Sequence, residues 1–206
     1  MPARRGNVGD PTTQNALLDA AHHVMLTEGY AAATTRRVAN QAGVNSALVS
    51  YYFGSLDGMF VALFRRGAER SFERLQEALA SDQPLWGFWD LIHDRSNSAS
   101  TMEFIALANH RKVIRDEIAE YSRRFRNEQL VALADVLEGY GIDPGEWPAT
   151  VVVLILSSVS RFMLIEEAFG VDVGHAETEA RVEDFIRGLE GERCQPTTRP
   201  NVSSAT

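Results

Sequence analysis

Hydrophobic side chains recur every three to four residues along most of this chain, and polar side chains fill the positions between them. Leu17, Ala21 and Val24 begin such a stripe, and the same period returns in later segments. This spacing places apolar groups on one face of an α-helix. No segment shows the alternation of a half-buried strand, so the pattern predicts an all-α fold with about nine helices.

Proline, glycine and short polar runs divide this pattern into separate helices. The longer expected helices are 11–28, 56–81, 85–94, 101–110, 111–141, 148–169 and 176–189, with two short ones between residues 34 and 53. A polar run at 95–100 is expected to be a loop. We expect a flexible N-terminal arm (1–11), a three-helix head (12–55), a larger helical bundle (56–190) and a disordered tail (191–206).

The two short helices have the spacing of a helix-turn-helix. Ala39 is small enough for a second helix to cross closely, Gly43 can take the left-handed conformation of a tight turn, and Val49 supplies a buried anchor. Thr34 is expected to cap the first helix through its hydroxyl. The second helix, about Ser46 to Tyr52, presents small and hydroxyl-bearing side chains that suit a DNA major groove.

The context of this motif carries more information than its spacing, which arises often by chance. Glu28-Gly29-Tyr30 precedes the motif, TTRRVA, AGV and YYF lie within it, and Gly54-Ser55-Leu56-Asp57 follows. The block at about 15–64 thereby resembles the DNA-binding domain of the TetR family of bacterial transcriptional repressors. The resemblance implies a sequence-specific repressor that binds a near-palindromic operator in double-stranded DNA.

The same resemblance implies which residues face DNA. The expected set is Thr34, Thr35, Arg36, Arg37, Ser46, Ala47, Ser50, Tyr51 and Tyr52. Arg36 is expected to reach a base edge, whereas both threonines and both tyrosines are expected to contact phosphates. The sequence departs from the family at Leu56, where lysine is usual, and at Ser50, where tyrosine is frequent. We therefore expect one phosphate contact to be missing and the base preference to differ.

The charge distribution fits DNA binding despite a net charge of -8. Residues 1–74 hold 8 arginines and 6 acidic residues, whereas residues 75–206 hold 12 basic and 22 acidic residues. A mildly basic head is thus joined to an acidic body.

The body carries more large apolar side chains than a small bundle needs to fill its centre, which predicts a site for a hydrophobic effector. The expected lining is Trp86, Trp89, Met102, Phe104, Ile105, Asn109, His110, Phe125, Arg161 and Phe162. Its polar members, Asn109, His110 and Arg161, are expected to orient the ligand, and core packing is the alternative role for the others. In the resembling family, a filled pocket shifts the helix that begins near Leu56 and releases DNA.

The most apolar run, Ala149 to Ile165, is 17 residues long and contains three serines and Arg161. It is short for a membrane span and is better interpreted as a helix buried in protein. Together with Phe185, Ile186 and Leu189 it predicts a homodimer formed through the last two helices. The alternative is that the run fills the core of a single protomer.

The sequence contains no motif typical of catalysis or of metal binding. It has no Gly-rich phosphate loop, no H-E-x-x-H and no G-x-S-x-G, and its one cysteine, Cys194, lies in a polar tail. We therefore expect a non-enzyme without cofactor or metal, and a cytoplasmic one because no secretory segment begins the chain. The alternative function is an all-helical small-molecule binding or carrier protein without operator recognition, which Leu56 leaves open.

Overall fold

The computed structural model describes residues 10–194, except for the side chains of residues 96 and 97. Within this range all regular structure is helical, which confirms the predicted all-α fold. The helices are α1 (Pro11–Glu28), η1 (Tyr30–Ala32, a 3-10 turn), α2 (Thr35–Ala42), α3 (Ala47–Phe53), α4 (Leu56–Leu79), α5 (Pro84–Ile92), α6 (Arg95–His110), α7 (Lys112–Gly139), α8 (Ala149–Glu167) and α9 (His175–Glu190). The arm at 1–9 and the tail at 195–206 lie outside the described residues.

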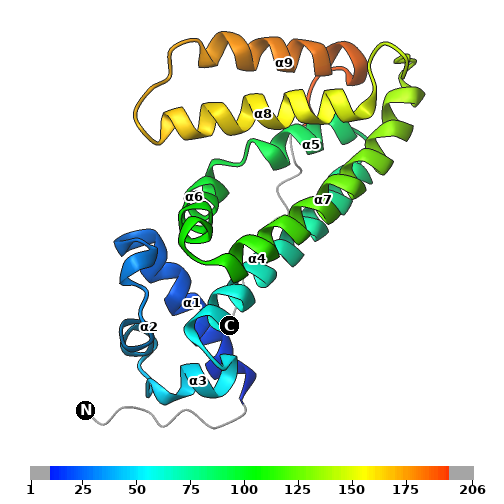
Figure 1. Cartoon of the computed structure of the whole chain (residues 1–206). Helices are drawn as coiled ribbons and strands as arrows, with labels where there is room; N and C mark the ends of the chain where they lie inside the picture. The colour runs from blue at the N-terminus through cyan, green and yellow to red at the C-terminus, as the bar shows by residue number, and fades with distance from the viewer. Residues whose placement is uncertain (1–9, 195–206) are drawn as a thin grey trace, which may run out of the picture.

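The helices form a small head and a larger body (Figure 1). Helices α1, α2 and α3 make up the head, and α4 leads out of it alongside α7. Helices α8 and α9 lie at the far end, and each packs on α5. Helix α6 stands between the two regions and contacts α1, α7 and α8.

Local capping fixes where the head helices begin. Asp10 accepts a hydrogen bond through Oδ1 from the N–H of Thr12, 2.9 Å away, and Pro11 occupies the first turn of α1. Ser55 caps α4 in the same way by accepting from the N–H of Gly58 at 3.0 Å. These caps satisfy backbone donors that have no partner within their own helix.

The predicted loop at 95–100 is wrong, because the structure continues α6 back to Arg95. Arg95 donates from Nε and Nη2 to both carboxylate oxygens of Glu167, at 2.9 and 2.8 Å. Ser98 donates its hydroxyl to the backbone oxygen of Arg95. A polar composition therefore marks an exposed first turn here, and a tertiary ion pair holds that turn in place.

Two hydrophobic cores follow one another along the molecule. The first joins the head to α6 and the start of α7, with Phe104, Leu107 and Ile114 among the buried side chains that pack with α1 and α4. The second joins α4, α5, α7, α8 and α9. The first core therefore does not end with the head helices, and it ties the head to the body through α6.

The carboxylate of Glu190 joins three segments around the second core. Glu190, at the end of α9, accepts hydrogen bonds from the N–H groups of Leu85 and Trp86 at 2.8 and 3.0 Å. It also accepts from the hydroxyl of Tyr140 at 2.8 Å. Because the carboxylate serves the N-terminus of α5, it stabilises that helix end through both hydrogen bonds and the helix dipole.

Candidate nucleic-acid interface

Helices α2 and α3 are joined by the tight turn that the sequence predicts. The Thr34 hydroxyl accepts from the N–H of Arg37 at 3.3 Å, so the predicted cap is confirmed. Gly43 has φ +69° and ψ 28°, the left-handed conformation that glycine adopts without steric cost. The N–H of Val44 then donates to the backbone oxygen of Ala39 at 3.0 Å, which closes the end of α2.

The inner side of this unit is buried and its outer side is open. Val38, Ala39 and Val49 are almost inaccessible to solvent and fix the crossing of the two helices. Of the residues expected at DNA, those that are exposed are Thr34, Arg36, Ser46, Ala47, Ser50 and Tyr51. They supply one cation, several hydroxyls and one aromatic ring at the start of α2 and along α3.

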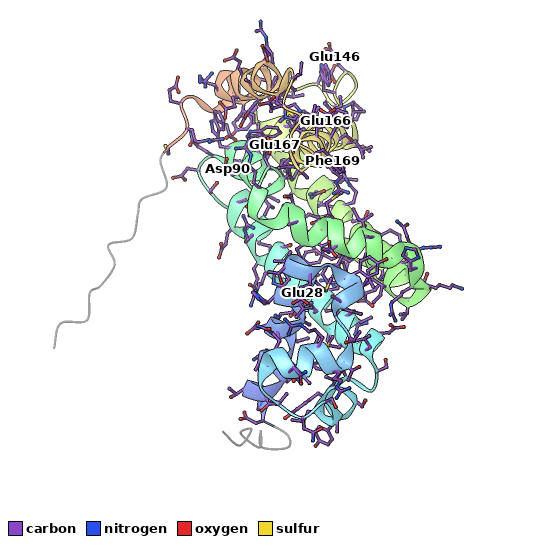
Figure 2. The ribbon with its side chains drawn as sticks, turned by 90° about the vertical axis from the view of Figure 1, so that its left-hand side faces the viewer. Glu28, Asp90, Glu146, Glu166, Glu167 and Phe169 are labelled. Carbon is purple, nitrogen blue, oxygen red and sulfur yellow. The ribbon has the colours of Figure 1, made fainter. Side chains whose placement is uncertain are left out.

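Arg37 is engaged within the protein, whereas the side chain of its neighbour Arg36 has no hydrogen bond or ion pair with the part of the chain that the structure describes. It donates from Nη2 and Nε to the two carboxylate oxygens of Glu28, at 2.5 and 3.1 Å, and from Nη1 to Gln41 at 3.0 Å. This guanidinium holds the pKa of the Glu28 carboxyl below its usual value. Glu28 lies at the end of α1 in the head (Figure 2), so Arg37 joins α1 to α2 here.

The two tyrosines of α3 differ in the same way. The Tyr52 hydroxyl donates to the backbone oxygen of Asp10 at 3.2 Å, which ties α3 to the start of α1. Tyr51 is 58% exposed and meets the Tyr52 ring edge-on. The structure therefore places Tyr51 at the surface, where a phosphate can reach it, and gives Tyr52 an internal role.

Two further residues, Asn45 and Leu56, lie near the starts of α3 and α4. Asn45 accepts through Oδ1 from the N–H of Ala47 at 2.8 Å and so starts α3. Sequence reasoning missed this contact, although an asparagine two residues before a helix is a recognisable signal. Leu56, where the resembling family usually has lysine, opens α4 and packs partly buried against the first core.

The residues expected to line an effector site do not share one cavity. Trp86 and Trp89 are buried in the second core with Phe125 against it, whereas Phe104 belongs to the first. Ile105, Asn109, His110, Arg161 and Phe162 are exposed, and Met102 is half-buried. Helices α5 and α6 turn their large side chains toward different cores, which helical spacing alone does not reveal. Effector binding by these residues stays a prediction.

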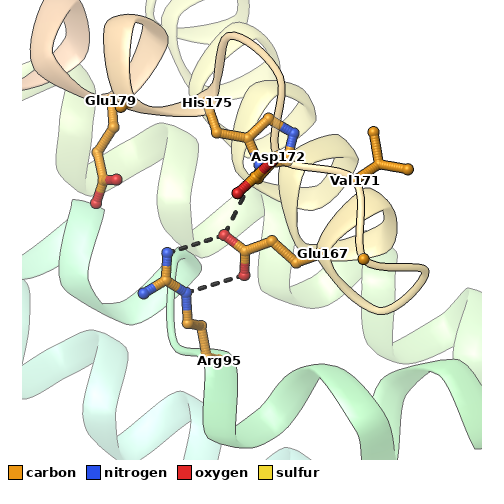
Figure 3. Close-up of a pocket in the computed structure, with 8 residues that line it drawn as sticks. Arg95, Glu167, Val171, Asp172, His175 and Glu179 are labelled. Atoms are coloured by element: carbon orange, nitrogen blue, oxygen red, sulfur yellow. Dashed lines mark hydrogen bonds and ion pairs between the residues drawn. The ribbon is translucent and has the colours of Figure 1, made fainter.

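The structure instead has a hollow of about 400 Å³ between the start of α6 and the loop that joins α8 to α9 (Figure 3). Its lining includes the Arg95–Glu167 pair, Asp172 and Glu179, so it is mainly acidic. His175 borders it and contacts Glu166 through Nε2 at 2.9 Å. A second hollow of about 300 Å³ lies between α4 and α7. Neither contains a residue expected to bind an effector, and the described residues hold no cluster of three or more His, Cys, Asp or Glu suited to a metal ion.

Comparison with known proteins shows which sequences this chain is similar to. The family model described as bacterial regulatory proteins, tetR family, matches residues 17–63, which contain α2, the turn and α3. The chain is 29% identical over 133 residues to the HTH-type transcriptional regulator BetI of Rhizobium meliloti (strain 1021). That match covers 60% of this chain and 66% of the relative, just under two thirds of its length.

Solved structures share the fold over most of this chain. A TetR transcription regulator from Haloarcula marismortui ATCC 43049 has a TM-score of 0.71 at 16% identity, over 87% of this chain and 99% of that one. A transcriptional regulator from Saccharomonospora viridis in complex with choline has a TM-score of 0.68 at 17% identity, over 89% of this chain and 100% of that one. At these identities the likeness establishes the fold. Residues 17–63 thus match the family of bacterial regulatory proteins described as tetR, and the chain as a whole is similar in fold to a solved TetR transcription regulator.

Proposed function

We propose that this protein is a cytoplasmic, homodimeric repressor that binds a near-palindromic operator and leaves it when a hydrophobic small molecule binds the body. The observation that carries the proposal is the capped α2–Gly43–α3 unit, whose inner face is buried while Arg36, Ser46 and Tyr51 stay exposed. Such a unit can place α3 in a major groove and the start of α2 beside a phosphate.

The chemistry of α3 supports groove binding. Ala47 and Ser50 are small, so the helix backbone can approach the base edges closely, and their neighbour Tyr51 can donate to a phosphate oxygen. Arg36 is the exposed cation nearest to this helix in the chain, and its guanidinium can pair with the acceptor edge of guanine. The head thus offers both base and backbone contacts.

A large exposed apolar surface supports the homodimer. On α8, Val151, Leu154, Ile155 and Phe162 are 40% to 61% exposed, and Phe185 of α9 is 45% exposed. Phe169, whose position in the loop after α8 Figure 2 shows, is 75% exposed. Apolar surface gathered on two helices is stabilised when a second copy covers it, and a two-fold axis then relates the two heads.

The length of α8 allows a different interpretation, which its packing does not favour. By length and hydropathy it is one helix that could cross a membrane, and 28% of that window is buried inside the protomer. Its other side, however, contributes Val152, Val153 and Leu156 to the second core against α5 and α7. A helix with one packed face and one exposed apolar face suits a bundle shared between two protomers.

Release by a ligand is supported by the way α6 connects the head to the body, because it packs in the first core and also contacts α7 and α8. Ligand binding in the body that shifts α6 changes its packing on α1 and α4, and thereby the position of α3. The relative from Saccharomonospora viridis holds a small molecule, choline, in the same fold. A ligand releases DNA only to the extent that it binds the released form better, so a hundredfold preference corresponds to about 2.7 kcal/mol of coupling.

The test is whether the purified protein selects a DNA sequence. Fragments from the region of its own gene are titrated by fluorescence anisotropy at several salt concentrations, against random DNA of equal length. A Ser46→Glu, Ser50→Glu variant is the matched control, since both positions are exposed and the change adds only repulsion from phosphates. We expect tight, salt-dependent binding that this variant loses.

The same experiment tests the alternative function, a small-molecule carrier protein without operator recognition. Leu56 favours that alternative, because an apolar side chain occupies the start of α4, where the resembling family usually has a phosphate-binding lysine. Equal affinity for the selected fragment and for random DNA would contradict operator recognition and favour the carrier function.

A further inference from the structure

On two neighbouring helices of the body, three buried polar atoms have no hydrogen-bond partner within residues 10–194. They are Nη1 of Arg126 and Oε1 of Gln129 on α7, and Oγ of Ser157 on α8. Among the described residues, Arg126 also has no carboxylate to neutralise it. Arg126 itself is half-buried, and a buried guanidinium N–H without an acceptor costs stability unless another group pairs with it, so this arrangement calls for an explanation.

Helical spacing places these atoms between α7 and α8. Arg126 precedes the fully buried Leu133 by seven residues, two turns earlier on the same face of α7. Ser157 follows the buried Val153 by four residues, one turn later on α8. Leu133 and Val153 belong to the same core, so the polar groups continue the apolar contact between the two helices.

A second arginine adds to the positive charge. Arg161 follows Ser157 by one turn, and no ion pair engages it among the described residues. Burial lowers the pKa of Arg126, and the positive charge of Arg161 lowers it further. From the loop that joins them, α7 and α8 diverge toward α6 (Figure 1).

Aromatic side chains lie beside this cationic pair. Phe125, adjacent to Arg126 in α7, stacks on Tyr121 with ring centres 5.3 Å apart, and both rings pack against Phe72 of α4. Burial raises the pKa of Tyr121, and the positive charge of Arg161 acts in the opposite direction. The positive groups and the apolar surface are therefore next to each other.

We propose that Arg126 and Arg161, with Gln129 and Ser157, bind the carboxylate of an amphipathic effector whose apolar tail lies against Phe125 and its neighbours. The carboxylate accepts from the guanidinium N–H groups and from the serine hydroxyl, and the Gln129 amide turns to donate its N–H. This inference rests on the proposed function, because it names the head group of the effector that releases DNA.

The test compares probes that share a tail and differ in the head group. Decanoate, decanol and decyltrimethylammonium, below their micelle-forming concentrations, and acetate as a head group without a tail, are each titrated by calorimetry and thermal unfolding. We expect decanoate to bind and to raise the unfolding temperature, with little effect of the others. Equal stabilisation by decanol or by the cation overturns an anion site, and equal stabilisation by acetate overturns the role of the tail.

Two variants assign the site to these residues. Arg126→Met keeps the length of the side chain and removes its charge, and we expect it to weaken decanoate binding by about ten- to hundredfold. We expect the ligand-free variant to unfold at a temperature no lower than the parent, since an uncompensated charge is gone. Arg123→Gln is the control, because Arg123 is an exposed arginine of the same helix paired with Glu120. Unchanged decanoate affinity in Arg126→Met, or equal losses in both variants, overturns the assignment.

Operator affinity separates this inference from the proposed function. Decanoate that binds through Arg126 without changing operator affinity supports the carboxylate site and contradicts its role in release. A parent protein that selects no operator contradicts the proposed function, whereas the calorimetric comparison of head groups still decides the site.

Discussion

The backbone N–H of Tyr30 donates to the Glu103 carboxylate, and the two atoms lie 2.6 Å apart across 73 positions of sequence. Tyr30 follows α1 in the head, and Glu103 lies in the middle of α6. The Tyr30 ring also stacks on His110 at the end of α6, with ring centres 6.0 Å apart. The middle and the C-terminal end of α6 are thus joined to the turn that leads into α2.

Glu103→Ala is expected to lower the free energy of unfolding by about 1 to 3 kcal/mol, because it leaves a partly buried N–H without an acceptor. Glu103→Gln keeps an acceptor oxygen and should cost less. Urea unfolding measures both, with Glu120→Ala as an exposed control. If α6 transmits ligand binding, Glu103→Ala also weakens the response of operator affinity to ligand. An unchanged response would show that the coupling takes another route.

Arg36→Ala is expected to cost about 1 to 3 kcal/mol of operator binding and to relax sequence preference, because the exposed guanidinium is assigned to a base edge. Tyr51→Phe should weaken specific and random DNA to a similar degree, since a phosphate contact carries no sequence information. Anisotropy titrations with both kinds of DNA measure the difference. Equal losses for both DNAs in Arg36→Ala would remove the base-reading role.

Leu56→Lys is expected to tighten binding to all sequences and to steepen the dependence of log affinity on log salt by about one unit. The new ammonium would sit in the first turn of α4, where the resembling family has a phosphate contact. Because Leu56 packs partly buried on the first core, some loss of thermal stability should accompany the change. Leu56→Met controls for that packing, and an unchanged salt slope would mean that this helix start does not reach DNA.

Local signals explain why the helices were predictable. The Asp10-Pro11 start, the Thr34 and Ser55 caps and the glycine at 43 act through hydrogen bonds and backbone angles within a few residues. Such effects can be predicted from residues that are close together in the sequence. The failure at Arg95 has the opposite cause, because a pair with Glu167, 72 positions away, fixes a turn whose composition suggests a loop.

Contacts between distant segments explain what the sequence did not reveal at the site. Arg36 and Arg37 are adjacent and identical in type, yet only Arg37 meets Glu28, nine residues earlier at the end of α1. Tyr51 and Tyr52 differ in the same way, because the Tyr52 hydroxyl donates to the backbone oxygen of Asp10 and Tyr51 lies at the surface. In the body, the period of three to four residues identifies a buried face without saying which core that face joins, so Trp89 and Phe104 were assigned to one pocket.

Ile155→Glu is expected to convert the proposed homodimer to monomers, because it places a charge in the middle of the apolar surface of α8. Ile155 is 46% exposed in the protomer, so helical content measured by circular dichroism should stay unchanged. Val131→Glu on α7, at a site 72% exposed, is the matched control. Sedimentation velocity at micromolar concentration reports the outcome, and a parent protein that sediments as a monomer would contradict the dimer.

Acidification is expected to destabilise the fold through His93, whose ring is buried between α5 and α8. Its Nδ1 lies 3.1 Å from Oγ of Ser160, and that hydroxyl donates to the backbone oxygen of Ile92 at 2.7 Å. The serine oxygen can then only accept, so Nδ1 carries the proton of a neutral ring. The other nitrogen, Nε2, has no hydrogen-bond partner among the described residues and lies 3.7 Å from Glu179.

Burial lowers the pKa of His93, although Glu179 acts in the opposite direction. Between that lowered pKa and the unfolded value near 6.5, the unfolded chain binds more protons than the folded one. Stability is therefore complete above about pH 6.5 and falls as the pH drops toward the folded pKa. Burial lowers the pKa of His22 too, so it contributes with the same sign.

Urea unfolding at about pH 7.5 and about pH 5.5 measures this fall. His93→Gln keeps a polar side chain near Ser160 and removes the titration, so the difference in free energy of unfolding between the two pH values should shrink. His23→Gln changes an exposed histidine of α1 and should leave the difference as it is in the parent protein. A His93→Gln protein that loses as much stability on acidification as the parent would show that the buried ring takes up its proton without disturbing the contact between α5 and α8.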